Sequence, residues 1–174
     1  MKKAMLFCMG IIFLFTGCVD SKMREIPKSD QAVNHLFERS ARSIEKKYKM
    51  KAIGTVVAMP EGVVKELGLS FQIQGPLIKE EIRKILITSA KDFLQIVNSD
   101  EAVRPYLTKY PFEIKNVEIT LFLVDSQGIG LDDPYIGVAG LSRGELDYQI
   151  LVTTHIPKIK CESVESYEEA LISK

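Results

Sequence analysis

Tryptophan is absent from this chain, and histidine and cysteine are scarce, with two and three residues among 174. A zinc site needs three or four ligands, and neither His35 nor His155 has a ligand-spaced partner nearby in the sequence. The segment Gly140-Leu141-Ser142-Arg143-Gly144 matches the letters GxSxG, but it lies at a predicted hairpin turn between two strands and not at the strand-to-helix turn of a nucleophile elbow, and there is no cysteine-protease signature. Local motifs for hydrolysis or for a resident metal are therefore lacking, and an active site assembled from distant residues stays open as the alternative.

An excess of charge of either sign is also lacking. The chain has 23 basic and 23 acidic residues. Without residues 1–17, which hold Lys2 and Lys3 but no acid, the balance becomes slightly acidic. Such a balance provides no general attraction to the phosphates of a nucleic acid or to an anionic surface. Nucleic acid is therefore not an expected partner.

No hydrophobic run is long enough to span a bilayer comfortably. Residues 4–15 are apolar and follow Lys2 and Lys3, but a membrane-spanning helix needs about 20 apolar residues. A charged start and a short apolar core are typical of a secretory signal. The motif Phe15-Thr16-Gly17-Cys18 then places two small residues directly before a cysteine.

This segment resembles the lipobox of bacterial lipoproteins, with Phe15 in the position that leucine usually holds. The resemblance implies cleavage between Gly17 and Cys18 and acylation of Cys18 by chains such as palmitate. It therefore implies a cell-envelope protein attached to a membrane. Val19 follows the cysteine, so the aspartate that retains lipoproteins in the inner membrane is not at that position, and the outer membrane is preferred. An uncleaved anchor is the alternative.

The domain organisation follows from this signal. Residues 1–17 form the signal peptide, residues 18–29 form a lipidated N-terminus and polar tether, and residues 30–174 form one globular domain. Within the mature chain Cys161 is then the only cysteine besides Cys18. Burial as a small hydrophobic residue is expected for Cys161, and pairing with a partner is the alternative.

Periodicity predicts the secondary structure of this domain. Asp30 is the predicted N-cap of a first helix, whose apolar stripe repeats at spacings of three and four. A second amphipathic helix is predicted over residues 78–97, a shorter piece over residues 103–110 with a new start near Pro105, and a last helix from a capping box of Ser166 and Glu169. A single helical turn is predicted within residues 62–68.

Strands are predicted where β-branched residues gather or where apolar and polar residues alternate. They cover residues 50–59, 69–74, 117–124, 135–141 and 146–153, and the last two flank the turn Ser142-Arg143-Gly144-Glu145. Short connections favour antiparallel neighbours, and the amphipathic helices need a sheet face to cover. The predicted fold is an α+β two-layer sandwich of about five mostly antiparallel strands covered by amphipathic helices.

Two further patterns bear on ligand binding. The loop around Gly128 and Gly130 has no third glycine for a dinucleotide fingerprint, so a hairpin loop is predicted, and a metal would be sought at Asp125, Asp132 and Asp133. Two predicted strands have small faces, for which tight packing of a helix on the sheet is expected, and close approach of a backbone or a ligand is the alternative. These small residues are Ala52, Gly54 and Ala58 in one strand and Gly137, Ala139 and Gly140 in the other.

A binding surface, if built from aromatic anchors, would use Tyr106, Tyr110, Phe112, Tyr135 and Tyr148. The stretches Arg104-Pro105-Tyr106-Leu107 and Tyr110-Pro111-Phe112 also resemble uncharacterised lipoproteins of chlamydia-like bacteria, a resemblance that implies no activity. The leading hypothesis is a non-catalytic binding or assembly module in the envelope, with another envelope protein as its partner and with no cofactor. The alternatives are a membrane-tethered hydrolase or metal-dependent enzyme and a purely structural lipoprotein.

Overall fold

The computed structural model of the chain describes residues 26–152 and 158–173. The predicted signal peptide, the lipidation site Cys18 and His155 lie outside the described residues. The elements in chain order are α1 (Lys28–Tyr48), β1 (Lys51–Ala58), β2 (Glu66–Gln74), α2 (Lys79–Ser99), β3 (Val117–Val124), β4 (Ile136–Ser142), β5 (Glu145–Val152), β6 (Lys158–Ser166) and α3 (Tyr167–Ile172).

The six strands form one open sheet in the order β1-β2-β3-β4-β5-β6. Strands β2 and β3 pair in parallel because α2 carries the chain back between them, and the other neighbours pair antiparallel. The α+β class and the mostly antiparallel sheet are confirmed, whereas about five strands is one too few. The strand that the sequence missed is β6.

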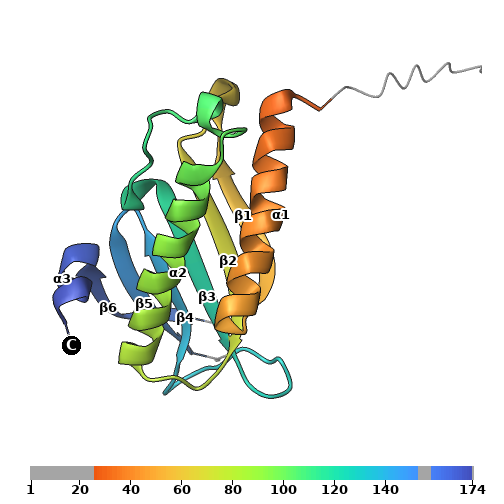
Figure 1. The fold of residues 1–174 in the computed structure, drawn as a ribbon. Helices are drawn as coiled ribbons and strands as arrows, with labels where there is room; N and C mark the ends of the chain where they lie inside the picture. Colours follow the sequence, from red (N-terminus) through yellow and green to blue (C-terminus); the bar gives the residue numbers. More distant parts are fainter. Residues whose placement is uncertain (1–25, 153–157, 174) are drawn as a thin grey trace, which may run out of the picture.

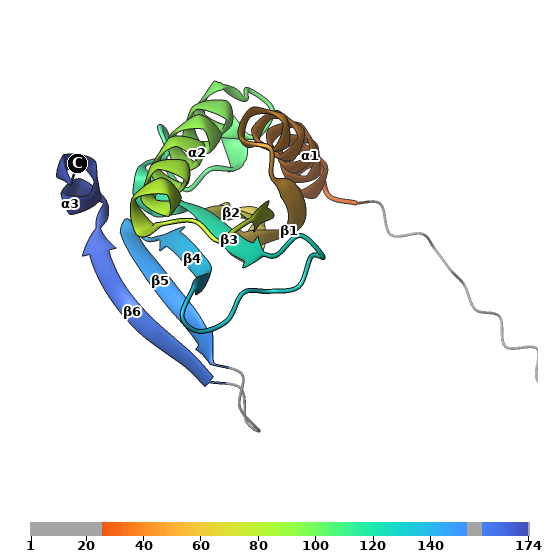
Figure 2. The ribbon, with the colours of Figure 1, turned by 90° about the horizontal axis from the view of Figure 1, so that it is seen from below.

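Helices α1 and α2 cover one face of this sheet (Figure 1). Alternate residues of the central strands, including Leu69, Phe71, Ile119 and Leu121, are fully buried beneath them, as a period of two requires. The predicted stripe of α1 supplies Val33, Phe37 and Ile44 to the same core. No helix of the described residues covers the opposite face of the sheet (Figure 2).

Two predicted starts have different outcomes. The capping box of α3 is confirmed, because Ser166 Oγ accepts the Glu169 N–H at 3.2 Å and the Glu169 carboxylate accepts the Ser166 N–H at 2.8 Å. Asp30 as the N-cap of α1 is wrong, because the helix begins at Lys28 after an extended Pro27. Asp30 lies in the first turn instead, where the helix dipole favours a negative charge. The helix therefore includes the last two residues of the predicted tether, Lys28 and Ser29.

The connections are tighter than their sequence patterns suggest. The turn predicted within residues 62–68 is wrong: a 3-10 turn at Pro60–Gly62 comes earlier, and β2 already begins at Glu66. Proline fixes φ near the helical value, which favours a turn at Pro60 rather than after it. The predicted piece over residues 103–110 contains one 3-10 turn, Arg104–Tyr106, and a further 3-10 turn, Ile114–Asn116, precedes β3.

None of the helices in the described part of the chain combines the length and the apolar content that a membrane-crossing helix requires.

Candidate binding edge

The open sheet has two free edges among the described residues, formed by β1 and β6 (Figure 2). An edge strand presents unpaired N–H and C=O groups to which another strand can bind. Native proteins usually protect such edges with charged side chains, with bulges or with a covering element. The two edges of this sheet differ in that protection.

Strand β6 carries three exposed charged side chains along its length, Lys158, Lys160 and Glu162. The register with β5 also shifts between Tyr148 and Gln149, where β6 has one extra residue. Charges and a mid-strand bulge both hinder the approach of another strand. The edge formed by β6 is therefore protected.

Strand β1 has little of this protection. Charged residues are absent between Lys51 and Pro60, and the apolar side chains of Ile53, Val56 and Val57 are 46%, 39% and 46% exposed. A neutral, β-branched segment on an exposed edge is the composition that favours addition of a further strand. We call residues 54–58 the β1 edge.

The part of β1 that is free for pairing is short and regular. At its start, the Glu45 carboxylate accepts the backbone N–H of Ala52 at 2.7 Å, which occupies that donor. The register with β2 then shifts between Ala52 and Gly54, so Ile53 is the extra residue of a bulge. From Gly54 to Ala58 the pairing with β2 is continuous, and this stretch can template a ladder.

Helix α1 lies over β1 and forms a shallow depression beside it. Four α1 residues and Thr55 line this depression, whose volume is about 330 Å³. Thr55 therefore faces α1, and alternation places Val57 on the same face and Val56 on the other. A Cβ at Gly68 on β2 would lie 3.1 Å from Cβ of Val56, which agrees with that placement. The α1 residues are Asn34, Phe37, Glu38 and Ala41.

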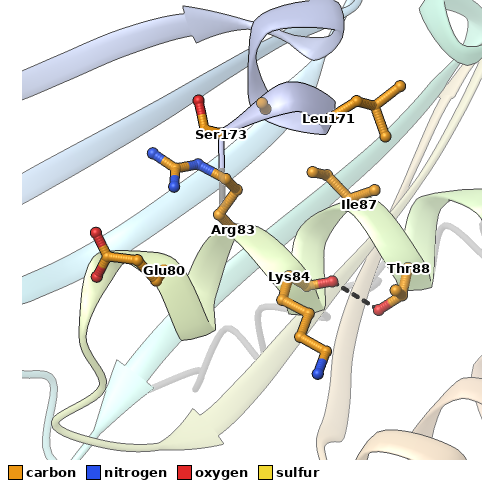
Figure 3. A pocket seen from close by; sticks show the side chains of 8 residues that line it. Glu80, Arg83, Lys84, Ile87, Thr88, Leu171 and Ser173 are labelled. Carbon is orange, nitrogen blue, oxygen red and sulfur yellow. Dashed lines mark hydrogen bonds between the residues drawn. The ribbon is translucent and has the colours of Figure 1, made fainter.

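A second hollow lies between α2 and α3 and is about 370 Å³ in volume (Figure 3). Arg83 and Ile87 point toward α3 in Figure 3, whereas Lys84 points away from it. Leu171 of α3 lines this hollow together with Ile87. The Arg83 guanidinium is already held by Glu165 of β6 through an Nε–Oε1 contact of 2.8 Å. The Arg83 charge in this hollow is thus engaged within the protein.

Glu165 of β6 is the centre of a partly buried polar cluster. The hydroxyl of Tyr148, a fully buried residue, donates to Glu165 Oε1 at 2.5 Å, and Lys79 Nζ lies 4.7 Å from the Tyr148 ring centroid. Burial raises the pKa of Tyr148 above its usual range, and the hydrogen bond to Glu165 adds to this rise. Burial also acts to raise the pKa of Glu165, but the hydrogen bonds from Arg83 and Tyr148 outweigh it, and the pKa is lowered. The cluster fastens β6 to α2 and β5.

The five predicted aromatic anchors are not all available at the surface. Phe112 and Tyr148 are buried, so their rings belong to the core. Tyr106 is half-buried against the core, whereas Tyr110 and Tyr135 are 53% and 49% exposed. The Arg104 guanidinium lies 4.6 Å from the Tyr110 ring centroid, and the Tyr110 hydroxyl donates to the Asn98 carbonyl.

The loop between β3 and β4 is closed by its own backbone. The Asp125 carboxylate accepts the N–H groups of Gln127 and Ile129 at 2.8 and 2.9 Å. Among the described residues, no three His, Cys, Asp or Glu side chains gather in a way that could hold a metal ion.

Gly137 accommodates the loop between β3 and β4, because an added Cβ would lie 2.3 Å from the Leu131 carbonyl oxygen. Helix packing is therefore the wrong explanation for Gly137, which is small because a backbone approaches it.

Burial of Cys161, which the sequence favoured, is also wrong. Cys161 is exposed and has no disulfide partner among the described residues. It pairs with Gln149 near the bulge of the edge strand β6.

Comparisons with protein-family models, with curated proteins and with solved structures find no match to this chain.

Proposed function

We propose that this chain is an envelope lipoprotein, anchored through acylated Cys18, whose α+β domain is a non-catalytic module that binds another envelope protein. The observation that carries the proposal is the unprotected β1 edge, which contrasts with the protected edge formed by β6. An exposed edge strand of this composition promotes aggregation when nothing covers it. A partner that covers the strand would explain why this composition is present. The outer membrane remains the preferred location.

The proposed anchor would keep the β1 edge close to the membrane surface. Helix α1 begins at Lys28, and the chain from Cys18 to that point spans at most roughly 35 Å when fully extended. Two or more acyl chains hold a protein firmly on a membrane, whereas one chain binds only marginally. A partner in the same membrane or attached to it is therefore the most accessible one.

The test is cross-linking of the full-length protein in its native envelope, followed by identification of the proteins that co-purify. Cys18→Ala is the matched control, because it removes the acylation site and leaves residues 26–174 unchanged. We expect one dominant partner with the unaltered chain and its loss with Cys18→Ala. Cross-linked material no different from the background would refute the proposal, as would an unmodified Cys18 in the mass spectrum of the purified protein.

A further inference from the structure

We propose that the β1 edge binds an extended, uncharged segment of the partner protein, which adds a seventh strand to the sheet beneath α1. This inference rests on the proposed function, because it names the kind of segment that the envelope partner supplies. Main-chain hydrogen bonds along residues 54–58 would provide affinity, and the side chains on each face would provide selectivity.

The first argument is the difference between the two edges. Both are strands of similar length in the same sheet, with eight residues in β1 and nine in β6. Charges and a bulge in mid-strand hinder pairing to β6, whereas in β1 the bulge and the Glu45 contact affect only the start of the strand. Residues 54–58 are uncharged and pair with β2 without interruption. Their outer edge can therefore form hydrogen bonds with a further strand.

The second argument concerns what can fit beside this edge. A second copy of the chain, paired through the same strand about a two-fold axis normal to the sheet, would bring its own α1 to the same face. Adjacent strands lie about 4.8 Å apart, whereas the axes of packed helices lie about 8–10 Å apart. Because α1 lies over β1 (Figure 2), the two α1 helices would collide. An extended segment without a helix of its own avoids this collision.

The third argument is the charge at the two ends of the edge. Exposed Lys49 and Lys51 precede it, and exposed Glu61 follows it. A segment that is uncharged over about five residues, with an acid at one end and a base at the other, would complement both ends. Its side chains on the α1 face would lie beside the depression next to Thr55, whose volume is about 330 Å³.

The experiment places the photo-cross-linking residue p-benzoylphenylalanine at Val57 in the full-length chain in its native envelope. The same residue at Val164 is the matched control, because Val164 is also an exposed valine on an edge strand. After irradiation, mass spectrometry of the adduct identifies the partner peptide. We expect an adduct at Val57 that maps to an extended, uncharged segment of another protein, at least about tenfold more abundant than any adduct at Val164.

A pair of lysine variants measures whether the edge itself is required. Val56→Lys introduces the charge that protects natural edges, and we expect it to lower recovery of the partner at least about tenfold, which corresponds to about 1.4 kcal/mol. Val164→Lys, on the other edge, should change recovery less than about twofold. Circular dichroism of both variants checks that each is folded.

The outcomes separate this inference from the proposed function. A partner that depends on Cys18 but is recovered equally with Val56→Lys would leave the proposed function standing and overturn the inference. An adduct between Val57 and a second copy of this chain would also overturn it and identify the edge as a dimer interface. Absence of any partner, with or without Cys18, would refute both.

Discussion

Replacing Tyr148 by phenylalanine would isolate one hydrogen bond in the cluster that fastens β6. The Tyr148 hydroxyl donates to Glu165 Oε1 at 2.5 Å, and the same oxygen accepts from Arg83 Nε at 2.8 Å. Phenylalanine keeps the buried ring and its contact with Lys79, whose Nζ lies 4.7 Å from the ring centroid. The change therefore removes a hydrogen bond to a charged group and little else.

Hydrogen bonds to charged groups contribute about 1.5–3 kcal/mol to stability. We expect Tyr148→Phe to lower the free energy of unfolding by about 2 kcal/mol, measured by urea denaturation of the purified protein, with an unchanged m-value. Hydrogen exchange should show the loss first in β6, because Glu165 is the β6 residue that both Arg83 and Tyr148 hold.

The matched control is Tyr110→Phe. The Tyr110 hydroxyl is exposed and lies 3.3 Å from the Asn98 carbonyl oxygen, so its removal should cost less than about 0.5 kcal/mol. If Tyr148→Phe costs no more than this control, the Glu165 cluster adds nothing beyond ordinary surface contacts. The conclusion that it fastens β6 to the sheet would then be wrong.

The remaining predictions concern backbone packing and pH. Gly137→Ala should lower the free energy of unfolding by about 1–3 kcal/mol, because its Cβ would lie 2.3 Å from the Leu131 carbonyl oxygen. Gly130→Ala, where an added Cβ meets nothing within 4 Å, should be nearly neutral in the same denaturation assay, and equal effects would contradict the packing argument. The raised pKa of Tyr148 predicts that stability is complete below its unfolded pKa of about 10 and declines as the pH rises beyond it; Tyr148→Phe should flatten this decline, and an unchanged slope would refute the assignment. The lowered pKa of Glu165 predicts a contribution that is present above its unfolded pKa of about 4.3 and is lost as the pH falls through its folded value; Glu165→Gln should remove that part of the acid limb, measured by unfolding at a series of pH values.

The elements with strong periodicity could be predicted from the sequence, and β6 shows why others could not. In β3 every second residue, from Val117 to Leu123, is buried, so alternation alone reveals the strand. In β6 the alternation runs only from Lys158 to Glu162, breaks at Ser163, and places Ile159 in solvent rather than in the core. That strand is fixed by pairing with β5 and by the Arg83–Glu165 contact, which joins residues 82 positions apart. A local pattern does not contain such a contact.

Only one of the two properties that define the β1 edge could be predicted from the sequence. The absence of charge between Lys51 and Pro60 can be read directly, but it fits a buried central strand as well as an edge strand. Only the strand order places β1 at the edge. The aromatic side chains misled for the opposite reason, because Phe112 and Tyr148 have the composition of binding anchors but fill the core instead.

The short tether that we propose makes coverage of the β1 edge more pressing than it would be in a freely diffusing protein. Molecules confined to one surface meet one another at high effective concentration, and an unprotected strand promotes edge-to-edge association. The position of α1 over β1 addresses this hazard, because it hinders pairing with a second copy that brings its own helix to the same face (Figure 2). An extended segment without such a helix is not hindered. The same arrangement therefore acts against self-association and favours a strand from a different protein.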